Sequence, residues 1–181
     1  MFNLSTQDAV MSIEKSPLER VGGKIYQEYQ DFFGSGFSLP SLEGKKFVKL
    51  DSQELKPRIR LDYNDEMMKK ITVFFMNSNI TNALEKKFDT KLKFKSADLW
   101  VDDVGYFLLP HTDDDSIKLA TQIYLSDDNV GTSLYDDAGK LQYTFPFRFN
   151  CGYSLYNGEG SHHGVEKIMK NGRTSLYVRY Q

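Results

Sequence analysis

An alternating stretch between residues 141 and 150 constrains the fold more than any other part of the sequence. Leu, Tyr, Phe, Phe and Phe occupy every second position, and Gln, Thr, Pro, Arg and Asn stand between them. A period of two directs apolar side chains to one face of a β-strand and polar ones to the other. We expect this strand to cover residues 141–149 and to form a hairpin with residues 132–135, across a turn at 136–139.

Other short segments of β-type residues occur on both sides of this hairpin, separated by Gly- and Asp-rich turns. We predict further strands at 106–111, 118–125, 153–156, 163–168 and 174–180. Strands at this spacing indicate a jelly roll or a barrel. The 13 Phe and 11 Tyr residues suit such a β-rich core.

The first 92 residues show helical rather than alternating patterns. Pro17 follows Ser16 as at a helix start, and residues 25–33 have the spacing of a short amphipathic helix. A stripe of Met, Ile and Phe recurs at helical spacing from residue 65 onward. Residues 77–79 (Asn-Ser-Asn) interrupt it, and a second helix is expected over 80–88. We therefore expect a single domain, 1–181, with a mostly helical cover at 1–92 and a β core at 93–181.

Composition limits the classes of function. The net charge is -2 and no basic stripe is present, which argues against binding of nucleic acid through its phosphates. The apolar runs are too short to span a membrane, and the first residues lack the pattern of a signal peptide. Cys151 is the single cysteine and has no partner for an internal disulfide. These features favour a cytoplasmic protein.

The tripeptide His111-Thr112-Asp113 ends one of the expected strands. Residues i and i+2 of a strand share a face, so His111 and Asp113 can reach one metal ion. The chain has three His residues, so a further imidazole ligand must be His162 or His163. Two His and one carboxylate occupy one face of an octahedral Fe(II) and leave the other positions free. The polar residues after His111 also fit a surface turn.

A second segment contains His163-Gly164-Val165 and, ten residues after the histidine, Arg173-Thr174-Ser175. With these motifs, the sequence resembles the Fe(II)/2-oxoglutarate-dependent dioxygenases, most nearly their prolyl-4-hydroxylase-like branch. That family carries His-x-Asp, then a distal His before a small residue and Val, then a basic residue at the spacing seen here. Residues 123–126 (Ile-Tyr-Leu-Ser) and Gly131-Thr132 are similar to a strand of the family and the turn after it.

The resemblance implies a fold and a set of site residues. The fold is α+β and mainly β: a double-stranded β-helix (jelly roll) with N-terminal helices packed on one face. The implied Fe(II) ligands are His111, Asp113 and His163. The implied contacts to the distal carboxylate of 2-oxoglutarate are Arg173, Ser175 and Tyr124. Adjacent strand residues face opposite ways, so His162 is not expected to join His163 as a ligand.

The implied reaction is hydroxylation of an unactivated C–H bond, in which 2-oxoglutarate and O2 become succinate and CO2. Ascorbate is a candidate stimulant of this reaction. Asp113 favours hydroxylation, because the related halogenases lack this carboxylate. The primary substrate is expected to be a peptide, an amino acid or a small metabolite, with a prolyl residue ranked first.

Other classes remain open. Arg179 stands six residues after Arg173, as in the Arg-x-Asn-x-x-x-Arg segment of the nucleic-acid-repairing branch, but Ser175 replaces that Asn, which together with the lack of a basic surface argues against that branch. A non-enzymatic jelly-roll binding module would carry the same strands without a metal. A cupin-like metalloenzyme without 2-oxoglutarate would keep the metal, although cupins commonly use more His ligands than this chain offers.

Overall fold

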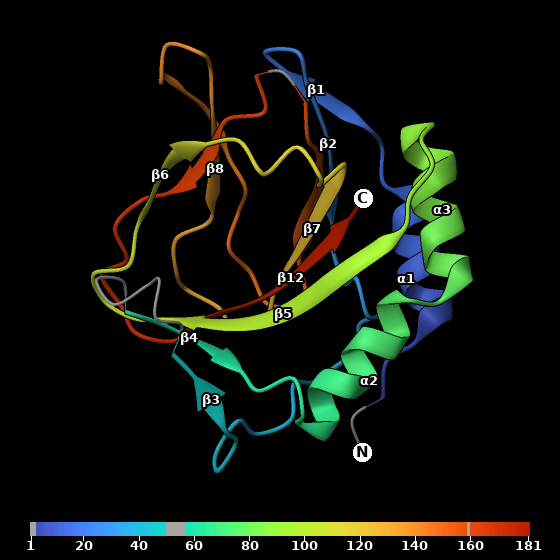
Figure 1. Ribbon diagram of the computed structural model, residues 1–181, viewed down its shortest axis with the longest axis vertical. Coiled ribbons are helices and arrows are strands. Elements are labelled where there is room, and N and C mark those ends of the chain that lie inside the picture. Colours follow the sequence, from blue (N-terminus) through green and yellow to red (C-terminus); the bar gives the residue numbers. More distant parts are fainter. Residues whose placement is uncertain (1–2, 50–56, 159) are drawn as a thin grey trace.

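The computed structural model describes residues 3–49, 57–158 and 160–181, and its strands form two antiparallel sheets (Figure 1). The larger sheet has the order β1 (Glu19–Val21), β2 (Lys24–Tyr29), β10 (Gly152–Tyr156), β7 (Leu119–Tyr124), β12 (Arg173–Tyr180), β5 (Phe94–Asp102), β4 (Arg58–Leu61) and β3 (Phe47–Val48). The smaller sheet has the order β6 (Leu108–His111), β11 (His163–Val165), β8 (Thr132–Tyr135) and β9 (Leu141–Thr144). The prediction of a mainly β chain is confirmed.

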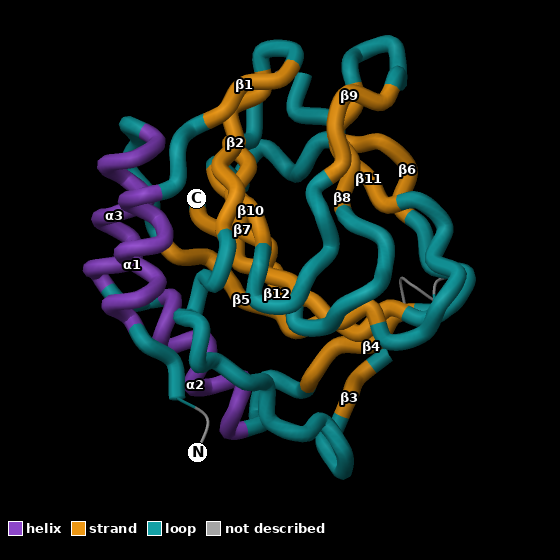
Figure 2. Tube along the Cα trace, turned by 180° about the vertical axis from the view of Figure 1, so that it is seen from behind, coloured by secondary structure: helices purple, strands orange, loops and turns teal. Residues whose placement is uncertain are grey.

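Three helices lie on one side of the larger sheet, and the smaller sheet lies on the other (Figure 2). They are α1 (Thr6–Lys15), α2 (Glu66–Phe75) and α3 (Ser78–Phe88). Asp65 caps α2 by accepting from the amide of Met67, and Asn77 caps α3 by accepting from the amide of Asn79. Both predicted helices are present, and the second begins at Ser78 rather than at residue 80, because Asn77 alone provides the cap. None of the helices in the described segments has the length and apolar character needed to cross a bilayer.

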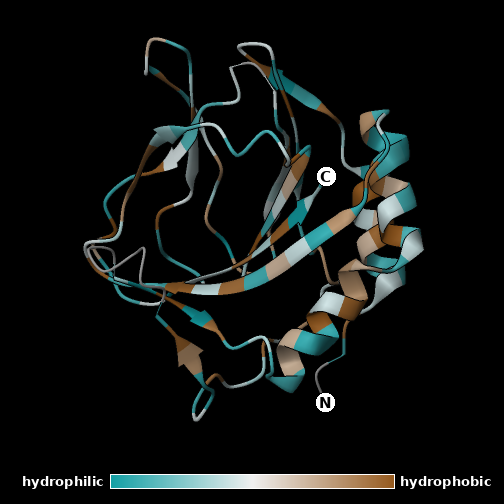
Figure 3. Cartoon of the chain, viewed as in Figure 1, coloured by the Kyte–Doolittle hydropathy of each residue, from teal (hydrophilic) through white to brown (hydrophobic). Residues whose placement is uncertain are grey.

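The two faces of the larger sheet have opposite character. Leu99, Ile123 and Leu176 belong to the apolar core that the sheet shares with the helices. Their sequence neighbours on the opposite face include the buried polar side chains of Gln122 and Ser175. Hydrophilic and hydrophobic residues accordingly alternate along β5 (Figure 3). The polar face looks toward the smaller sheet, and this is where a site can form.

The N-terminal half differs from the sequence prediction. The expected helix over residues 25–33 is wrong, because Lys24–Tyr29 forms β2 and pairs with β10. A helix starting at Ser16 is also wrong: α1 ends at Lys15, and the Ser16 amide closes it by donating to the Ser12 carbonyl. Ser16 is extended, as expected before a proline. The segments 3–49 and 57–92 contain four strands, β1 to β4, as well as the three helices, and these strands join the larger sheet.

The strand predicted at 141–149 is shorter than expected. β9 ends at Thr144, and the Phe145 amide still donates to the Thr132 carbonyl. Pro146 follows, and because proline has no amide hydrogen it cannot continue the pairing. The alternating pattern still places apolar side chains inside, because Phe145 and Phe147, on either side of Pro146, are both buried in the core between the two sheets.

Candidate metal centre

The histidines of the two motifs meet across neighbouring strands of the smaller sheet. His111 ends β6, His163 begins β11, and the two residues are direct cross-strand partners. Their ring centroids are 4.5 Å apart. Asp113 completes the group, with its Oδ1 3.8 Å from Nε2 of His163. One potential ligand atom from each of the three residues lies within 4.8 Å of the others, close enough to surround one metal ion.

The backbone orients both imidazoles. Nδ1 of His111 lies 2.9 Å from the Leu109 carbonyl oxygen, and Nδ1 of His163 lies 3.0 Å from that of Ser161. A proton on each Nδ1 satisfies these carbonyls and leaves both Nε2 lone pairs for a metal. Burial lowers the pKa of His163 below its ordinary value, against the opposing effect of Asp113. The ring is therefore neutral at pH 7, which is the metal-binding form.

The carboxylate of Asp113 is also held in place. The hydroxyl of Tyr177, on β12, donates to its Oδ2 over 2.8 Å. This bond occupies one oxygen, while Oδ1 lies nearer His163. Tyr177 is two residues beyond Ser175 and lies on the same strand face, and this spacing could have identified Tyr177 as a residue near the site.

Glycine at position 164 allows the two histidine strands to approach closely. A methyl group built on Gly164 would lie 2.5 Å from the carbonyl oxygen of Leu108 on β6. That distance is far below van der Waals contact. Gly164 is thus required by the strand spacing beside His163 and not only by the motif.

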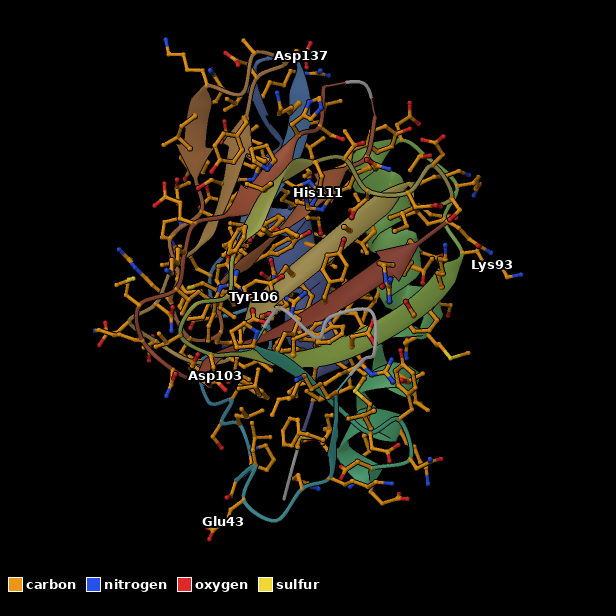
Figure 4. The ribbon with its side chains drawn as sticks, turned by 60° about the vertical axis from the view of Figure 1, so that its left-hand side comes forward. Glu43, Lys93, Asp103, Tyr106, His111 and Asp137 are labelled. Atoms are coloured by element: carbon orange, nitrogen blue, oxygen red, sulfur yellow. The ribbon has the colours of Figure 1, made fainter. Side chains whose placement is uncertain are left out.

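His162 points away from this group. Its Nδ1 lies 3.4 Å from Oδ1 of Asp137, a residue in the turn between β8 and β9. In Figure 4, Asp137 is at the edge of the molecule, whereas His111 lies nearer its middle. The opposite orientation of the adjacent histidines agrees with the alternation expected of a strand.

A small cavity opens beside the three candidate ligands, with a volume of about 150 Å³. Arg58, Tyr106 and Tyr177 form other parts of its wall. It is smaller than the roughly 300–1,000 Å³ of sites that enclose drug-sized ligands. A small molecule bound next to the metal position is what this space can accommodate.

The three residues expected to bind 2-oxoglutarate lie close behind this cavity. Arg173 is fully buried and donates through Nη1 to Oδ2 of Asp102 over 2.8 Å. Ser175 Oγ accepts from Gln122 Nε2 over 3.0 Å, and the Tyr124 hydroxyl accepts from the Thr132 amide over 3.0 Å. None of the three belongs to the described wall of the cavity. The structure therefore brings them to the site but one layer behind its surface.

Arg58 is a site residue that the sequence analysis missed. It lies on β4, pairs with Asp102 through Nε and Nη2, and lines the same cavity as the three candidate ligands. Its signal was the alternation of Arg with apolar residues over 58–61, which is typical of a strand with one basic face. That signal is short, and nothing in it shows that the strand borders β5.

No protein-family model and no curated protein matches the chain. Solved structures do match in fold. A 2OG-Fe(II) oxygenase family oxidoreductase from Burkholderia pseudomallei gives a TM-score of 0.56 at 14% identity, covering 97% of this chain and 76% of that one. AviO1 from Streptomyces viridochromogenes Tue57 gives 0.55 at 10% identity, with 99% and 96% covered.

A third match is SnoN, a non-heme alpha ketoglutarate dependent epimerase from nogalamycin biosynthesis. It gives a TM-score of 0.56 at 13% identity, covering 77% of this chain and 67% of that one. At such identities the likeness establishes the fold: this chain is built like proteins that include 2OG-Fe(II) oxygenases.

Proposed function

We propose that the protein is an Fe(II)- and 2-oxoglutarate-dependent dioxygenase that hydroxylates an unactivated C–H bond. The observation that carries the proposal is the convergence of His111, Asp113 and His163 on one point beside a small cavity. Two neutral imidazoles and one carboxylate suit Fe(II) and leave positions open for co-substrates. When bound, the iron supplies the O2 chemistry that is coupled to conversion of 2-oxoglutarate to succinate and CO2.

The charge around the cavity supports a dianionic co-substrate. Two guanidiniums, those of Arg58 and Arg173, share the single carboxylate of Asp102. This cluster has a net charge of +1 at the side of the cavity, and a ligand carboxylate would neutralise it. Ser175 and Tyr124 support this wall from behind. In this proposal the strands form the double-stranded β-helix of the oxygenases.

The residues of the protein hold and orient the reactants. Tyr177 fixes Asp113, and the carbonyls of Leu109 and Ser161 fix the two imidazoles. His163 is buried, so water has little access to the proposed metal position from its side. The primary substrate would approach from the open side of the cavity. By the likeness of its motifs to the prolyl-4-hydroxylase-like branch, a prolyl or other amino-acid residue is the first substrate class to test.

Metal binding and turnover test the proposal together. The purified protein should bind one Fe(II) or Mn(II), and with Fe(II) and ascorbate it should convert 2-oxoglutarate to succinate slowly without a primary substrate. His163→Ala should abolish both properties, and the adjacent His162→Ala is the matched control that should retain them. Absence of metal from the wild-type protein would favour the non-enzymatic binding module. Stoichiometric metal without any binding of 2-oxoglutarate would favour the cupin-like alternative.

Product analysis separates hydroxylation from a second outcome. The fold neighbour SnoN is an epimerase that depends on alpha ketoglutarate, so a C–H oxidation on this fold need not end in a hydroxyl group. Mass spectrometry of candidate peptides, amino acids and metabolites should detect the gain of one oxygen atom. A stereochemical change with no gain of mass would replace the hydroxylase assignment with an epimerase one.

A further inference from the structure

Arg58 and Arg173 share a carboxylate that cannot neutralise both. Arg58 reaches Oδ1 and Oδ2 of Asp102 through Nε and Nη2, at 2.5 and 3.3 Å, and Arg173 reaches Oδ2 through Nη1. The side chains of Asp102 and Arg173 are completely buried, and that of Arg58 is 14% exposed. Water therefore screens the excess positive charge poorly, and an anion in the adjacent cavity would be strongly favoured.

The two arginines differ in what their remaining nitrogens can do. Arg173 donates through Nε to the Val130 carbonyl over 2.7 Å, and its Nη2 lies 3.4 Å from Thr132 Oγ1. Its guanidinium is packed over the ring of Phe147 at 5.4 Å. Arg58, in contrast, has no hydrogen bond from Nη1 to any residue in the described ranges, and it lines the cavity beside the three candidate ligands.

Aromatic rings hold Arg58 in one position. Its guanidinium carbon lies 4.5 Å from the ring centre of Trp100 and 4.4 Å from that of Tyr106. Cation–π contact on two rings, together with the side-on pairing with Asp102, fixes the plane of the guanidinium. A ligand carboxylate can then bind its free edge without the entropic cost of ordering a flexible side chain.

We infer that Arg58 makes the direct contact with the second carboxylate of 2-oxoglutarate, and that Arg173 acts behind it as a positioning residue. Arg173 holds Asp102, which in turn holds Arg58, and it adds buried positive charge. The inference rests on the proposed function and changes its assignment of residues. It places the contact with the second carboxylate on β4, which carries none of the sequence motifs. The motifs alone would place this contact on β12.

The test compares two keto acids on the Mn(II)-loaded protein. One is 2-oxoglutarate, and the other is 2-oxopentanoate, which has the same chain length but lacks the second carboxylate. Trp100 is the only tryptophan in the sequence and stacks on Arg58, so its fluorescence reports binding at this wall. Titration calorimetry gives an independent affinity. The wild-type protein should prefer 2-oxoglutarate by about 10- to 100-fold, as expected for a charged hydrogen-bonded contact.

Arg58→Gln should remove this preference by weakening 2-oxoglutarate alone, with little change for 2-oxopentanoate or for Mn(II). Arg60→Gln is the matched control, on the same strand and the same face but paired with Asp98. It should retain the preference. Arg173→Lys keeps a buried charge and should retain most of the preference, with weaker binding of 2-oxoglutarate. Thermal melting of each variant checks that it is folded.

Two results would overturn the inference. The first leaves the proposed function intact, and the second contradicts it as well. If Arg58→Gln keeps the full preference while Arg173→Lys loses it, the contact belongs to Arg173 and the proposed function stands. If the folded, Mn(II)-loaded wild-type protein shows no preference between the two acids, the proposed function fails as well. Loss of the preference in a folded Arg58→Gln protein, with Mn(II) binding intact, supports the inference.

Discussion

Two groups of one aspartate and two arginines lie side by side on the polar face of the larger sheet. β4, β5 and β12 each contribute one residue to each group. The Asp102 group consists of Arg58, Asp102 and Arg173, and the Asp98 group consists of Arg60, Asp98 and Arg179. Both groups carry one negative and two positive charges, so any difference between them comes from their surroundings.

Access to water is the main difference. In the Asp102 group, Arg173 is fully buried, whereas in the Asp98 group the side chain of Arg179 is 29% exposed. Tyr63 adds a hydroxyl hydrogen bond to Asp98 at 2.5 Å. Burial, together with that bond, raises the pKa of Tyr63 to about 12, so it remains a donor at neutral pH. The same set of charges is thus more deeply buried in the Asp102 group, beside the cavity, and partly open to water through Arg179 in the Asp98 group.

Among substitutions in the two groups, Asp102→Asn is expected to cause the largest loss in the free energy of unfolding. Neutralising this carboxylate leaves two guanidiniums facing each other in a buried site, so unfolding should become easier by about 3–5 kcal/mol. Chemical denaturation of the metal-free protein measures the change. The exposed Asp115→Asn is the control, with an expected effect within about 0.5 kcal/mol. A loss below about 1 kcal/mol for Asp102→Asn would mean that the pair of arginines is not held as the structure has it.

Asp98→Asn should have a smaller effect, of about 1–3 kcal/mol, because water reaches Arg179. Salt sharpens the difference. At about 1 M NaCl the screening length falls to roughly 3 Å, which should shrink the cost of Asp98→Asn more than that of Asp102→Asn. Denaturation of both variants at low and high salt measures this. Equal salt responses would contradict the assignment of different solvent access to the two groups.

The smallest predicted effect concerns Tyr177, which lies between the two groups on β12. Tyr177→Phe removes the hydrogen bond to Asp113 and should weaken metal binding about tenfold, with the fold intact. Tyr180→Phe is a suitable control, since its hydroxyl bonds the Phe75 carbonyl on the helix side of the sheet. Competition with a metal chelator gives the affinities. An unchanged affinity in Tyr177→Phe would mean that the hydrogen bond from Tyr177 to Asp113 does not contribute to metal binding.

Prediction from the sequence succeeded where the signal is local. The capped helices around Asn77 depend on residues next to them in the chain, and so does the opposite orientation of His162 and His163. The prediction for residues 25–33 failed because Ile25 and Tyr29 are four apart, a spacing that places both side chains on one face of either a helix or a strand. Which one forms is decided by pairing with β10, far away in the sequence.

The same limit explains the incomplete description of the site. The grouping of His111, Asp113 and His163 could be anticipated because each belongs to a motif with a fixed internal spacing, and their role as metal ligands stays a prediction. Arg58 meets Asp102 only after β4 pairs with β5, and no local pattern encodes that register. The roles expected for Arg173, Ser175 and Tyr124 remain predictions, now with a geometry in which each contacts a named buried partner.

If His111 and His163 bind a metal ion as proposed, Gly164 has a consequence for metal selectivity. Because a side chain there would press on the Leu108 carbonyl, the separation of β6 and β11 is set by the absence of one carbon atom. His111 and His163 belong to those two strands, so the absence of a side chain at Gly164 also limits how far apart the two imidazole groups lie. A ligand pair with a fixed bite selects among metal ions by the bond lengths it permits. In the proposed centre, Gly164 would therefore influence which metal ion fits, although it supplies no side chain to the site.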